Sequence, residues 1–510
     1  KYIRFYWEIS NQERWKWINK TSGNERYVSI DNVVVDFSSA AVEFYKSRGG
    51  FTGSNYYFKE GIYYPRSPYK ANFSAKYLND DTLIEDGKPG LFPVRKNDLY
   101  FILGLMNSNI IIYFMNIINP TNNYQVGDVN RLPIIDFKPE YKKKVEELVL
   151  SNIEDLRYKF SLVETSRYFK LHNVLNLFSK SMKESIMNFL RIKDEIELEV
   201  YERDKVINNL VYETYKVSND EIEFIEDENG INNNTDLNKS DYSKLIDVDN
   251  NPNYDLLSSK FNLRKDILIK TRLEKELYGD KAIKKELENI INFFIGCIFG
   301  RWDNETDGIV DGIIPVNSSV YLEDDLVEKI YNIIIKFFGE EYADDIFDEI
   351  ENILGMPIER YIINNFFKNH SRSYEKRPIY WHICSPKKTF NCFVYYHKLD
   401  NDTLYKVKSI YLSQMIDRYE EDLKYYTSQL IEARTKGDKS KEKDFKDRCS
   451  DLEAKLEDLN ILDKKIMEIL PYKPNIDEGV LYNIIPLEPI LSAPVATKRE
   501  RDKYYEEVGK

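Results

Sequence analysis

Two runs of apolar residues near the C-terminal end constrain the fold of this chain most strongly. The first run advances in alternating steps of four and three residues, through Leu412, Ile416, Tyr419, Leu423, Tyr426 and Leu430. The second run follows the same rule, through Phe445, Cys449, Leu452, Leu456 and Leu459. Such steps place apolar side chains along one face of a helix and are typical of a coiled-coil seam. Because "TKGDKS" separates the runs, the sequence predicts an antiparallel coiled-coil helical hairpin over residues 409–470.

The N-terminal part of the chain has a different pattern. The stretches "YVSIDNVVVDF" and "ANFSAKYL" carry the β-branched and aromatic residues that strands favour, and Gly and Pro residues mark turns between them. A buried helix is expected over residues 97–118, where the sequence is almost continuously apolar. Together these features predict a β-rich domain over residues 1–135.

The middle of the chain is mostly helical in its periodicity. We expect a helical connector over residues 136–218 and a helical domain over residues 258–377. A β-hairpin that turns at "SPKK" is expected over residues 378–408, and a C-terminal tail over residues 471–510. The expected fold class is therefore α+β, with the β-rich domain followed by a large, mostly helical domain that carries a small β-hairpin and a coiled-coil arm.

Residues 219–257 are acidic and rich in Asn, which predicts a flexible insertion. The insertion contains "DVDNNP", which resembles the start of a calcium-binding loop. However, Pro252 stands where an EF-hand requires Gly, and Ser258 stands where it requires a bidentate Glu. These two departures argue against a calcium site.

The charge is unevenly distributed along the chain. The net charge is −13, which at first disfavours a nucleic-acid partner. Residues 1–135, however, hold 16 Lys and Arg against 13 Asp and Glu, while the other residues hold 57 against 73. Nucleic-acid binding depends on local rather than total positive charge. If the chain has a nucleic-acid site, it is therefore expected in residues 1–135.

The four cysteines form no CxxC pair, and they are expected to be reduced intracellular thiols. The apolar stretch "NIIIYFMNII" is too short to span a bilayer, and no signal peptide is recognised. We therefore expect a cytoplasmic protein with no membrane partner. The chain begins with Lys1 rather than Met, which suggests a part of a larger protein.

Motifs of catalysis and metal binding are not found in the sequence. There is no phosphate-binding loop, no GxSxG, no HExxH and no kinase signature. The four histidines have no close partner at the spacing of metal ligands, and a structural role is expected for each. No catalytic residue and no metal ligand is predicted, and the sequence alone leaves open whether the chain is part of an enzyme.

One stretch, residues 56–77, has the composition of a recognition surface. Its tyrosines alternate with residues that can hold phosphates or read base edges in DNA, namely Lys59, Arg66, Lys70, Asn72, Ser74 and Lys76. We predict that Arg66 and Asn72 read bases and that the lysines hold phosphates. The alternative is an ordinary tyrosine-rich pair of strands with solvated lysines.

The segment "NPTNNYQVGDVNRLPI" is rich in amides and ends where Pro133 stops a helix. Asn122 and Gln125 are candidates for phosphate contacts. The amides of this segment are equally suited to holding the backbone of the loop itself. Asp128 is expected to cap a short turn. Both roles, a DNA contact and a purely structural seam, stay open.

Several separated segments together resemble a known family. They are "IRFYWEIS", "ERWKWINK", "KEGIYYPRSPYKANFSAKY", "NPTNNYQVGDVNRLPI", "IGCIFGRWD", "RPIYWHICSPKKTFNCFVYYHKL" and "NIDEGVLYN". In this order they resemble the C-terminal two-thirds of the PglX-type adenine-specific DNA methyltransferases of BREX phage-defence systems. The family's S-adenosylmethionine motif and its Asn-Pro-Pro-Tyr motif are absent, and the chain contains no Pro-Pro dipeptide.

The resemblance implies a function in DNA target recognition for adenine N6 methylation of host DNA. It implies double-stranded DNA as partner, and S-adenosylmethionine as the cofactor of the complete enzyme, bound outside this chain. Within "IGCIFGRWD", the two glycines favour close helix packing, and Arg301 and Asp303 are a candidate ion pair.

Two alternative functions stay open. The acidic body favours a protein-interaction scaffold that binds other BREX components or a phage inhibitor. The chain is also compatible with the specificity part of a restriction–modification enzyme. In either case the coiled-coil arm is expected to contact a partner protein or to support a clamp around DNA.

Overall fold

The computed structural model describes most of the chain. The described residues are 2–10, 13–20, 25–51, 53–68, 73–121, 123–229, 279–302, 311–316 and 325–509. Three of the predicted DNA contacts, Lys70, Asn72 and Asn122, lie outside them. So do Asp303, the calcium-like stretch and most of the acidic insertion.

The N-terminal part folds into two small sheets, as expected from its β-branched and aromatic residues. The first sheet has the order β1-β3-β2-β6, with β1 at Ile3–Phe5, β2 at Trp15–Ile18, β3 at Val33–Asp36 and β6 at Thr82–Leu83. The second has the order β5-β4-β7, with β4 at Gly61–Tyr63, β5 at Lys76–Leu78 and β7 at Gly90–Leu91. A helix, α1 (Ser39–Ser47), follows β3, and Ser38 caps it through the backbone N–H of Ala41.

The prediction of one helix over residues 97–118 is wrong in one respect, because two helices occupy this range. They are α2 (Leu99–Met106) and α3 (Asn109–Ile118). The side chain of Asn107 donates to the carbonyls of Leu103 and Ala75 and accepts from the Ala75 N–H at 2.8 Å. Asn107 thus ends α2 and ties it to the strand region, and an extended Ser108 starts α3.

Among the described residues, no single helix is long and apolar enough to cross a membrane. The pair Lys96–Met106 and Asn109–Ile118 reaches that length and composition only when taken together, and it is bent by 75°.

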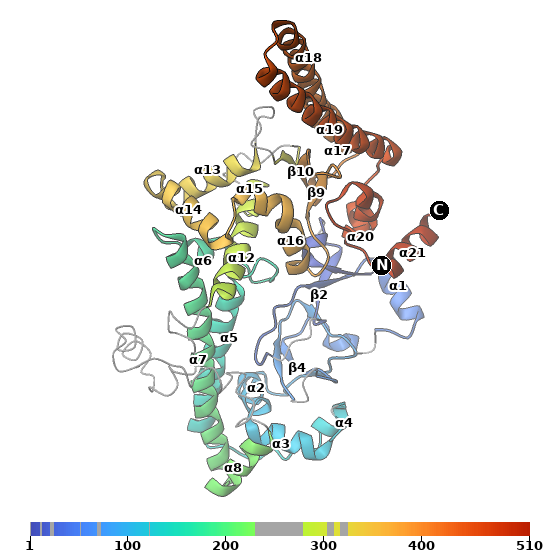
Figure 1. Ribbon diagram of the computed structural model, residues 1–510. Helices are drawn as coiled ribbons and strands as arrows, with labels where there is room; N and C mark the ends of the chain where they lie inside the picture. The colour runs from blue at the N-terminus through green and yellow to red at the C-terminus, as the bar shows by residue number, and fades with distance from the viewer. Residues whose placement is uncertain are drawn as a thin grey trace, which may run out of the picture.

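The helical body is built on two long helices, α5 (Pro139–Phe160) and α7 (Met182–Tyr215), which run side by side (Figure 1). A short helix, α6 (Leu171–Leu175), lies between them in sequence. The expected flexible insertion begins instead as a helix, α8 (Asn219–Glu228). Ser218 and Glu221 form a capping box at its start, and Ile225 is buried against α3, which explains why these acidic residues are helical.

The second half of the body surrounds a buried helix, α12 (Asp280–Ile298). Around it lie α13 (Leu326–Phe338), α14 (Ala343–Leu354), α15 (Ile358–Tyr361) and α16 (Phe367–Ser373). The predicted hairpin is confirmed as β9 (Tyr380–Cys384) and β10 (Asn391–Tyr395). A third strand, β8 (Ile313–Pro315), pairs with β10, so the expected all-helical domain contributes one strand to this sheet.

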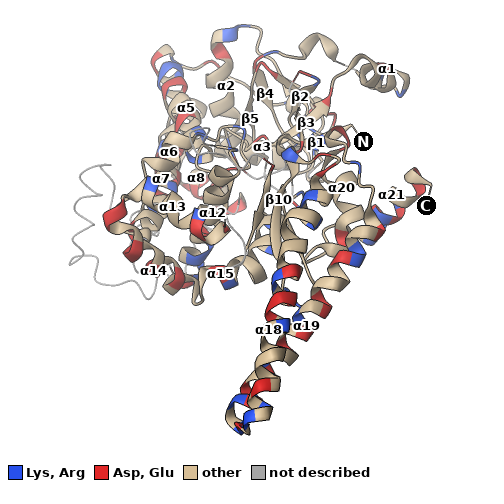
Figure 2. Ribbon diagram, turned by 90° about the horizontal axis from the view of Figure 1, so that it is seen from above, with Lys and Arg blue, Asp and Glu red and all other residues tan. Residues whose placement is uncertain are grey.

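The coiled-coil arm is confirmed. Helices α18 (Ser413–Lys436) and α19 (Lys439–Ile469) pack antiparallel and project from the body (Figure 1). Most seam residues are buried, namely Leu412, Tyr419, Leu430, Cys449, Leu452, Leu456 and Leu459. Gly437 adopts a left-handed conformation between the helices, which explains why the break falls in "TKGDKS". Acidic and basic residues are interspersed along both helices of the arm (Figure 2).

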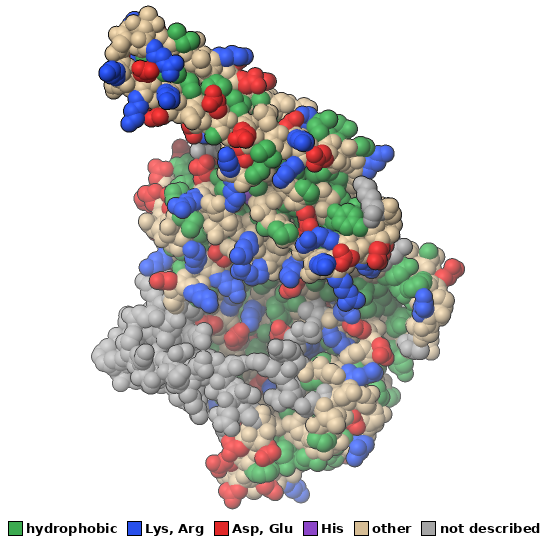
Figure 3. All heavy atoms as spheres, turned by 45° about the vertical axis from the view of Figure 1, so that its right-hand side comes forward, with side chains coloured by type: hydrophobic (Ala, Val, Ile, Leu, Met, Phe, Trp, Pro, Cys, Tyr) green, Lys and Arg blue, Asp and Glu red, His purple; other side chains and the backbone are tan. Residues whose placement is uncertain are grey.

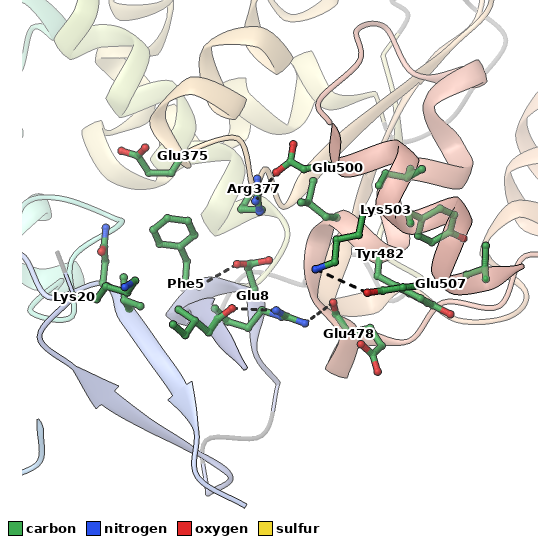
Figure 4. A pocket seen from close by; sticks show the side chains of 18 residues that line it. Phe5, Glu8, Lys20, Glu375, Arg377, Glu478, Tyr482, Glu500, Lys503 and Glu507 are labelled. Atoms are coloured by element: carbon green, nitrogen blue, oxygen red, sulfur yellow. Dashed lines mark hydrogen bonds and ion pairs between the residues drawn. The ribbon is translucent and has the colours of Figure 1, made fainter. Parts of the chain in front are cut away.

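The C-terminal segment, expected as a tail, packs onto the body through α20 (Gly479–Ile484), while α21 (Lys498–Val508) has no buried residue. A cleft of about 1070 Å³ separates these helices from β1 (Figure 4). Its charges are matched locally, because Arg377 pairs with Glu500 at 3.1 Å. Glu8 accepts the backbone N–H groups of Phe5 and Val480, each at 3.0 Å. The carboxylates along this cleft make it a poor site for phosphates.

Candidate nucleic-acid interface

Arg66 lies on the loop that follows β4, and backbone hydrogen bonds fix its position. Its N–H donates to the Gly87 carbonyl at 2.9 Å, and its carbonyl accepts from the Tyr124 N–H at 2.7 Å. The guanidinium lies 3.4 Å from a carboxylate oxygen of Asp86, whose side chain is 91% exposed. This exposed ion pair is weak and leaves the guanidinium available to an anionic ligand.

Lys59 is exposed on the loop between a short 3₁₀ helix, η2 (Ser54–Tyr56), and β4. Its ammonium lies 5.7 Å from the centre of the Tyr56 ring. An exposed lysine held against an aromatic ring has the chemistry of a phosphate contact.

The amide-rich segment of residues 119–134, called the seam below, uses most of its described side chains for hydrogen bonds within the segment. Asn119 donates to the Asn123 carbonyl and to a carboxylate oxygen of Asp128, at 2.9 and 2.6 Å. The hydrogen bond from Asn119 lowers the pKa of Asp128. The Gln125 N–H also donates to Asp128, at the start of α4 (Val126–Val129), so the expected capping role of Asp128 is confirmed. Tyr124 is fully buried and connects the seam to Arg66.

Gln125 is the seam's exposed member among the predicted contacts. Its side chain donates to Asn123 at 3.0 Å but stays at the surface. The other end of the seam is anchored to the body, because the Tyr215 hydroxyl donates to the Pro133 carbonyl at 2.7 Å. The described part of the seam is therefore a structural joint that presents three exposed amides, Asn123, Gln125 and Asn130.

Two predicted contacts, Ser74 and Lys76, are buried, at 5% and 1% exposure. Lys76 forms an ion pair with Glu25 at 3.6 Å, and burial lowers its pKa. A DNA duplex cannot reach either side chain in this structure, so neither Ser74 nor Lys76 is available as a DNA contact. The sequence pattern could have predicted the burial of Lys76. Lys76 and Leu78 are alternate residues of β5 and share its buried face.

A groove of about 870 Å³ lies beside Arg66 and was not anticipated from the sequence. Its walls include the aromatic residues Phe37, Phe44, Phe51, Tyr56 and Phe92. The basic residues Arg48 and Arg66, the amide of Asn130 and the acidic residues Glu85 and Asp86 line it as well. These residues come from both sheets, α1 and α4, so no local pattern in the sequence brings them together. Figure 3 shows hydrophobic and basic side chains next to one another on this side of the molecule.

Two tyrosines of the predicted recognition stretch, Tyr63 and Tyr64, are buried at 1% and 2% exposure. They belong to the core between the second sheet and its neighbours and cannot stack on a ligand. Tyr56 is 49% exposed and faces the groove. The aromatic part of the interface is thus supplied by Tyr56 together with phenylalanines from distant segments.

The segment "IGCIFGRWD" has a structural role in the part that the structure describes. The Arg301 guanidinium lies 4.3 Å from the Trp302 ring centre and donates to the Tyr374 hydroxyl at 3.2 Å. A Cβ atom at Gly296 would lie 2.6 Å from the Trp302 ring, so only glycine allows this close approach. Arg301 thus links the end of α12 to Tyr374 at the end of α16.

Among the described residues, no group of three or more His, Cys, Asp or Glu residues is placed to hold a metal ion. His370 is bonded through both ring nitrogens, to Asn292 and to the Ile379 N–H, each at 2.9 Å, as expected for a structural histidine. His382 lies 3.1 Å from Asn391 through Nε2, but its buried Nδ1 atom has no hydrogen-bond partner among the described residues. Burial lowers the pKa of His382 to about 3 and that of His397 to about 4.

No protein-family model matches the sequence. The chain is 23% identical over 461 residues to the adenine-specific methyltransferase BrxX of Escherichia coli O9:H4 (strain HS), covering 82% of this chain and 35% of that protein. It is 23% identical over 448 residues to the adenine-specific methyltransferase PglX of Lacticaseibacillus casei (strain Zhang), covering 81% and 33%. The chain spans about a third of these relatives, not the expected two-thirds. It is thus a distant homologue of adenine-specific methyltransferases over most of its length.

Proposed function

We propose that this chain is the DNA target-recognition part of an adenine-specific N6 methyltransferase that marks host DNA in BREX-type phage defence. The observation that carries the proposal is the similarity to two adenine-specific methyltransferases over more than four-fifths of the chain. A methyltransferase that modifies one adenine in a sequence needs a surface that binds duplex DNA and reads base edges. This chain would supply that surface.

The surface we propose lies in residues 1–135, around Lys59, Arg66 and Gln125. These three side chains are at least partly exposed and belong to the part of the chain with excess positive charge. Arg66 has the planar, bidentate donor geometry that recognises guanine or phosphate. Lys59 would hold a phosphate, and Gln125 would pair with adenine or bind the backbone. The backbone hydrogen bonds that join Arg66 to Gly87 and Tyr124 would hold Arg66 in a fixed position for contact with the DNA.

S-adenosylmethionine is the methyl donor that the resemblance implies. The described residues do not fit it, because neither large cavity is bounded by a glycine-containing turn leading from a strand into a helix. We therefore place donor binding and methyl transfer in a part of the protein outside this chain, and assign no catalytic step to its residues.

The proposal is tested by measuring the affinity of the chain for a fluorescent random-sequence duplex at several salt concentrations. The dissociation constant should rise steeply with salt, because phosphate contacts release counterions. The double variant Lys59→Ala/Arg66→Ala should bind more weakly at low salt. Its slope of log affinity against log salt should be shallower by roughly one to two, since each phosphate contact contributes about 0.9.

A matched control is the double variant Lys143→Ala/Lys144→Ala on α5, which removes two exposed lysines of the body. This control should bind as the unaltered chain does. Equal losses in the two double variants would refute a reading surface in residues 1–135, because binding would then follow total charge alone.

A second candidate function is a protein-interaction scaffold. It is favoured by the projecting arm, which exposes large apolar side chains such as Tyr425 and Ile431, 58% and 60% exposed. The excess of acidic residues outside residues 1–135 also favours partners other than DNA. Binding of a partner protein that is insensitive to salt, together with no binding of duplex DNA, would favour this function.

A further inference from the structure

The aromatic groove contains a rigid stacking platform. The Tyr56 ring stacks on the Phe92 ring, with centroids 4.7 Å apart and planes at 25°. The Phe92 ring lies flat across two strands, because a Cβ atom at Gly61 or Gly90 would be 2.7 Å from it. The two glycines thus leave the space in which the Phe92 ring lies, and Tyr56 extends the stack outward with half of its surface exposed.

Three aromatic rings of the groove each carry a cation close by. The Lys59 ammonium lies 5.7 Å from the Tyr56 ring centre, and the Lys46 ammonium lies 5.6 Å from that of Phe51. The Arg48 guanidinium lies 5.6 Å from the ring centre of Phe44. Rings that accept a planar group, with cations beside them that accept phosphates, are the arrangement by which proteins bind unpaired nucleotides.

Arg66 also lines the groove, and 30% of its side chain is exposed. Its planar guanidinium has donors that suit a phosphate oxygen or the acceptor edge of a nucleobase.

We propose that this groove holds an unpaired nucleotide of the bound DNA, with its base on the Tyr56 ring and its phosphates near Lys59 and Arg48. The inference rests on the proposed function, since it adds an unpaired nucleotide to the duplex DNA that the same N-terminal region is proposed to bind. An apolar peptide would use the rings but would bring no anionic group to the three cations. The groove's volume lies within the range of roughly 300–1,000 Å³ typical of small-ligand sites.

The test compares two fluorescein-labelled duplexes of identical sequence, one fully paired and one carrying two unpaired thymines. The unaltered chain should bind the bulged duplex about tenfold more tightly, the scale expected for a base stacking on an aromatic ring. Tyr56→Ala should abolish this preference, so that the variant binds the bulged and the fully paired duplex with equal affinity. Tyr56→Phe, which keeps the ring, should retain the preference.

Tyr425→Ala is the control, because Tyr425 is comparably exposed but lies on the arm. It should retain the preference for the bulged duplex. Circular dichroism and thermal unfolding of each variant would establish that it is folded before affinities are compared.

Failures of the two proposals are distinguishable. Equal affinity for both duplexes, or a preference that survives Tyr56→Ala, overturns the nucleotide groove and leaves duplex recognition standing. Binding of a single-stranded oligonucleotide without any binding of duplex overturns duplex recognition but supports the groove. Displacement of a groove-bound fluorescent dye by an apolar peptide, with no displacement by a thymine oligonucleotide, assigns the groove to a protein partner and overturns the inference.

Discussion

Lys59 and Lys76 belong to the same tyrosine-rich stretch, but only Lys59 is exposed. Composition identified the stretch as a recognition surface, and it could not separate these two lysines. The period of two along β5 could have done so, since Lys76 shares a face with the buried Leu78. Arg66 was predicted from the cations that alternate with tyrosines, and Gln125 from the amide-rich segment before Pro133, and both side chains are at least partly exposed.

Lys76→Ala should destabilise the protein rather than weaken DNA binding directly. The side chain is buried beside Glu25 and Asp31, and removing one member of a buried charge cluster leaves the others uncompensated. We expect a loss of about 3 kcal/mol in the free energy of unfolding, measured by urea denaturation. Lys59→Ala should leave this free energy unchanged. A stable Lys76→Ala protein would contradict the burial described here.

Asp31→Asn should change how stability depends on pH. Burial raises the pKa of Asp31 to about 6, above its ordinary value of 3.8, so the folded state holds this proton more tightly than the unfolded state. The stability of the unaltered protein relative to Asp31→Asn should therefore fall as the pH rises from about 4 to 7, by up to about 3 kcal/mol. Asn suits the positive φ of 43° at this position.

Urea denaturation of both proteins across this pH range measures the difference. Asp86→Asn is the control, because Asp86 is 91% exposed and its removal should produce no such trend. A difference between the unaltered protein and Asp31→Asn that is constant with pH, or that grows in favour of the unaltered protein, would exclude a buried Asp31.

At the level of helices and strands, elements with local signals were predicted well. The arm follows from its own heptads, and the β9–β10 hairpin follows from two β-rich runs around a short turn. The break between α2 and α3 depends on hydrogen bonds from Asn107 to Ala75, which is remote in sequence. The pairing of β8 with β10 is equally remote. Such contacts leave no periodic trace in the sequence.

The seam of the arm should dominate its stability. Leu459 has no exposed surface, whereas Ile461 on the same helix is 40% exposed. Leu459→Ala should cost about 2–5 kcal/mol, because it removes buried methyl groups and leaves a cavity. Ile461→Ala should change the free energy of unfolding by less than about 0.5 kcal/mol. Similar losses in both variants, measured by urea denaturation, would contradict the heptad register.

Gly90→Ala should disturb the aromatic platform on the second sheet. The added methyl group would lie 2.7 Å from the Phe92 ring, which forces the ring to move and costs about 1–3 kcal/mol. The displaced ring should also reduce the preference for the bulged duplex over the fully paired duplex. Gly127→Ala is the control, since its Cβ would meet nothing within 4 Å and alanine favours the helix there. An unchanged preference in Gly90→Ala would show that Phe92 need not be fixed.

In the molecule as a whole, the candidate DNA-binding features gather in residues 1–135. The exposed cations, the amide at the seam and the aromatic groove all lie there, on a body that is otherwise acidic. Bonds between distant segments join this part to the rest, such as the 2.8 Å bond from Arg4 to the Glu478 carbonyl. This arrangement would let one folded unit bind DNA through residues 1–135, while its acidic surfaces elsewhere would repel DNA.

The central claim is tested most directly by hydrogen exchange of the whole chain, measured by mass spectrometry with and without duplex DNA at low salt. We expect DNA to slow exchange in residues 53–68 and 123–131, around Arg66 and Gln125, and to leave the arm unchanged. Protection confined to residues 413–469 or to the helical body would contradict a DNA-reading surface in residues 1–135.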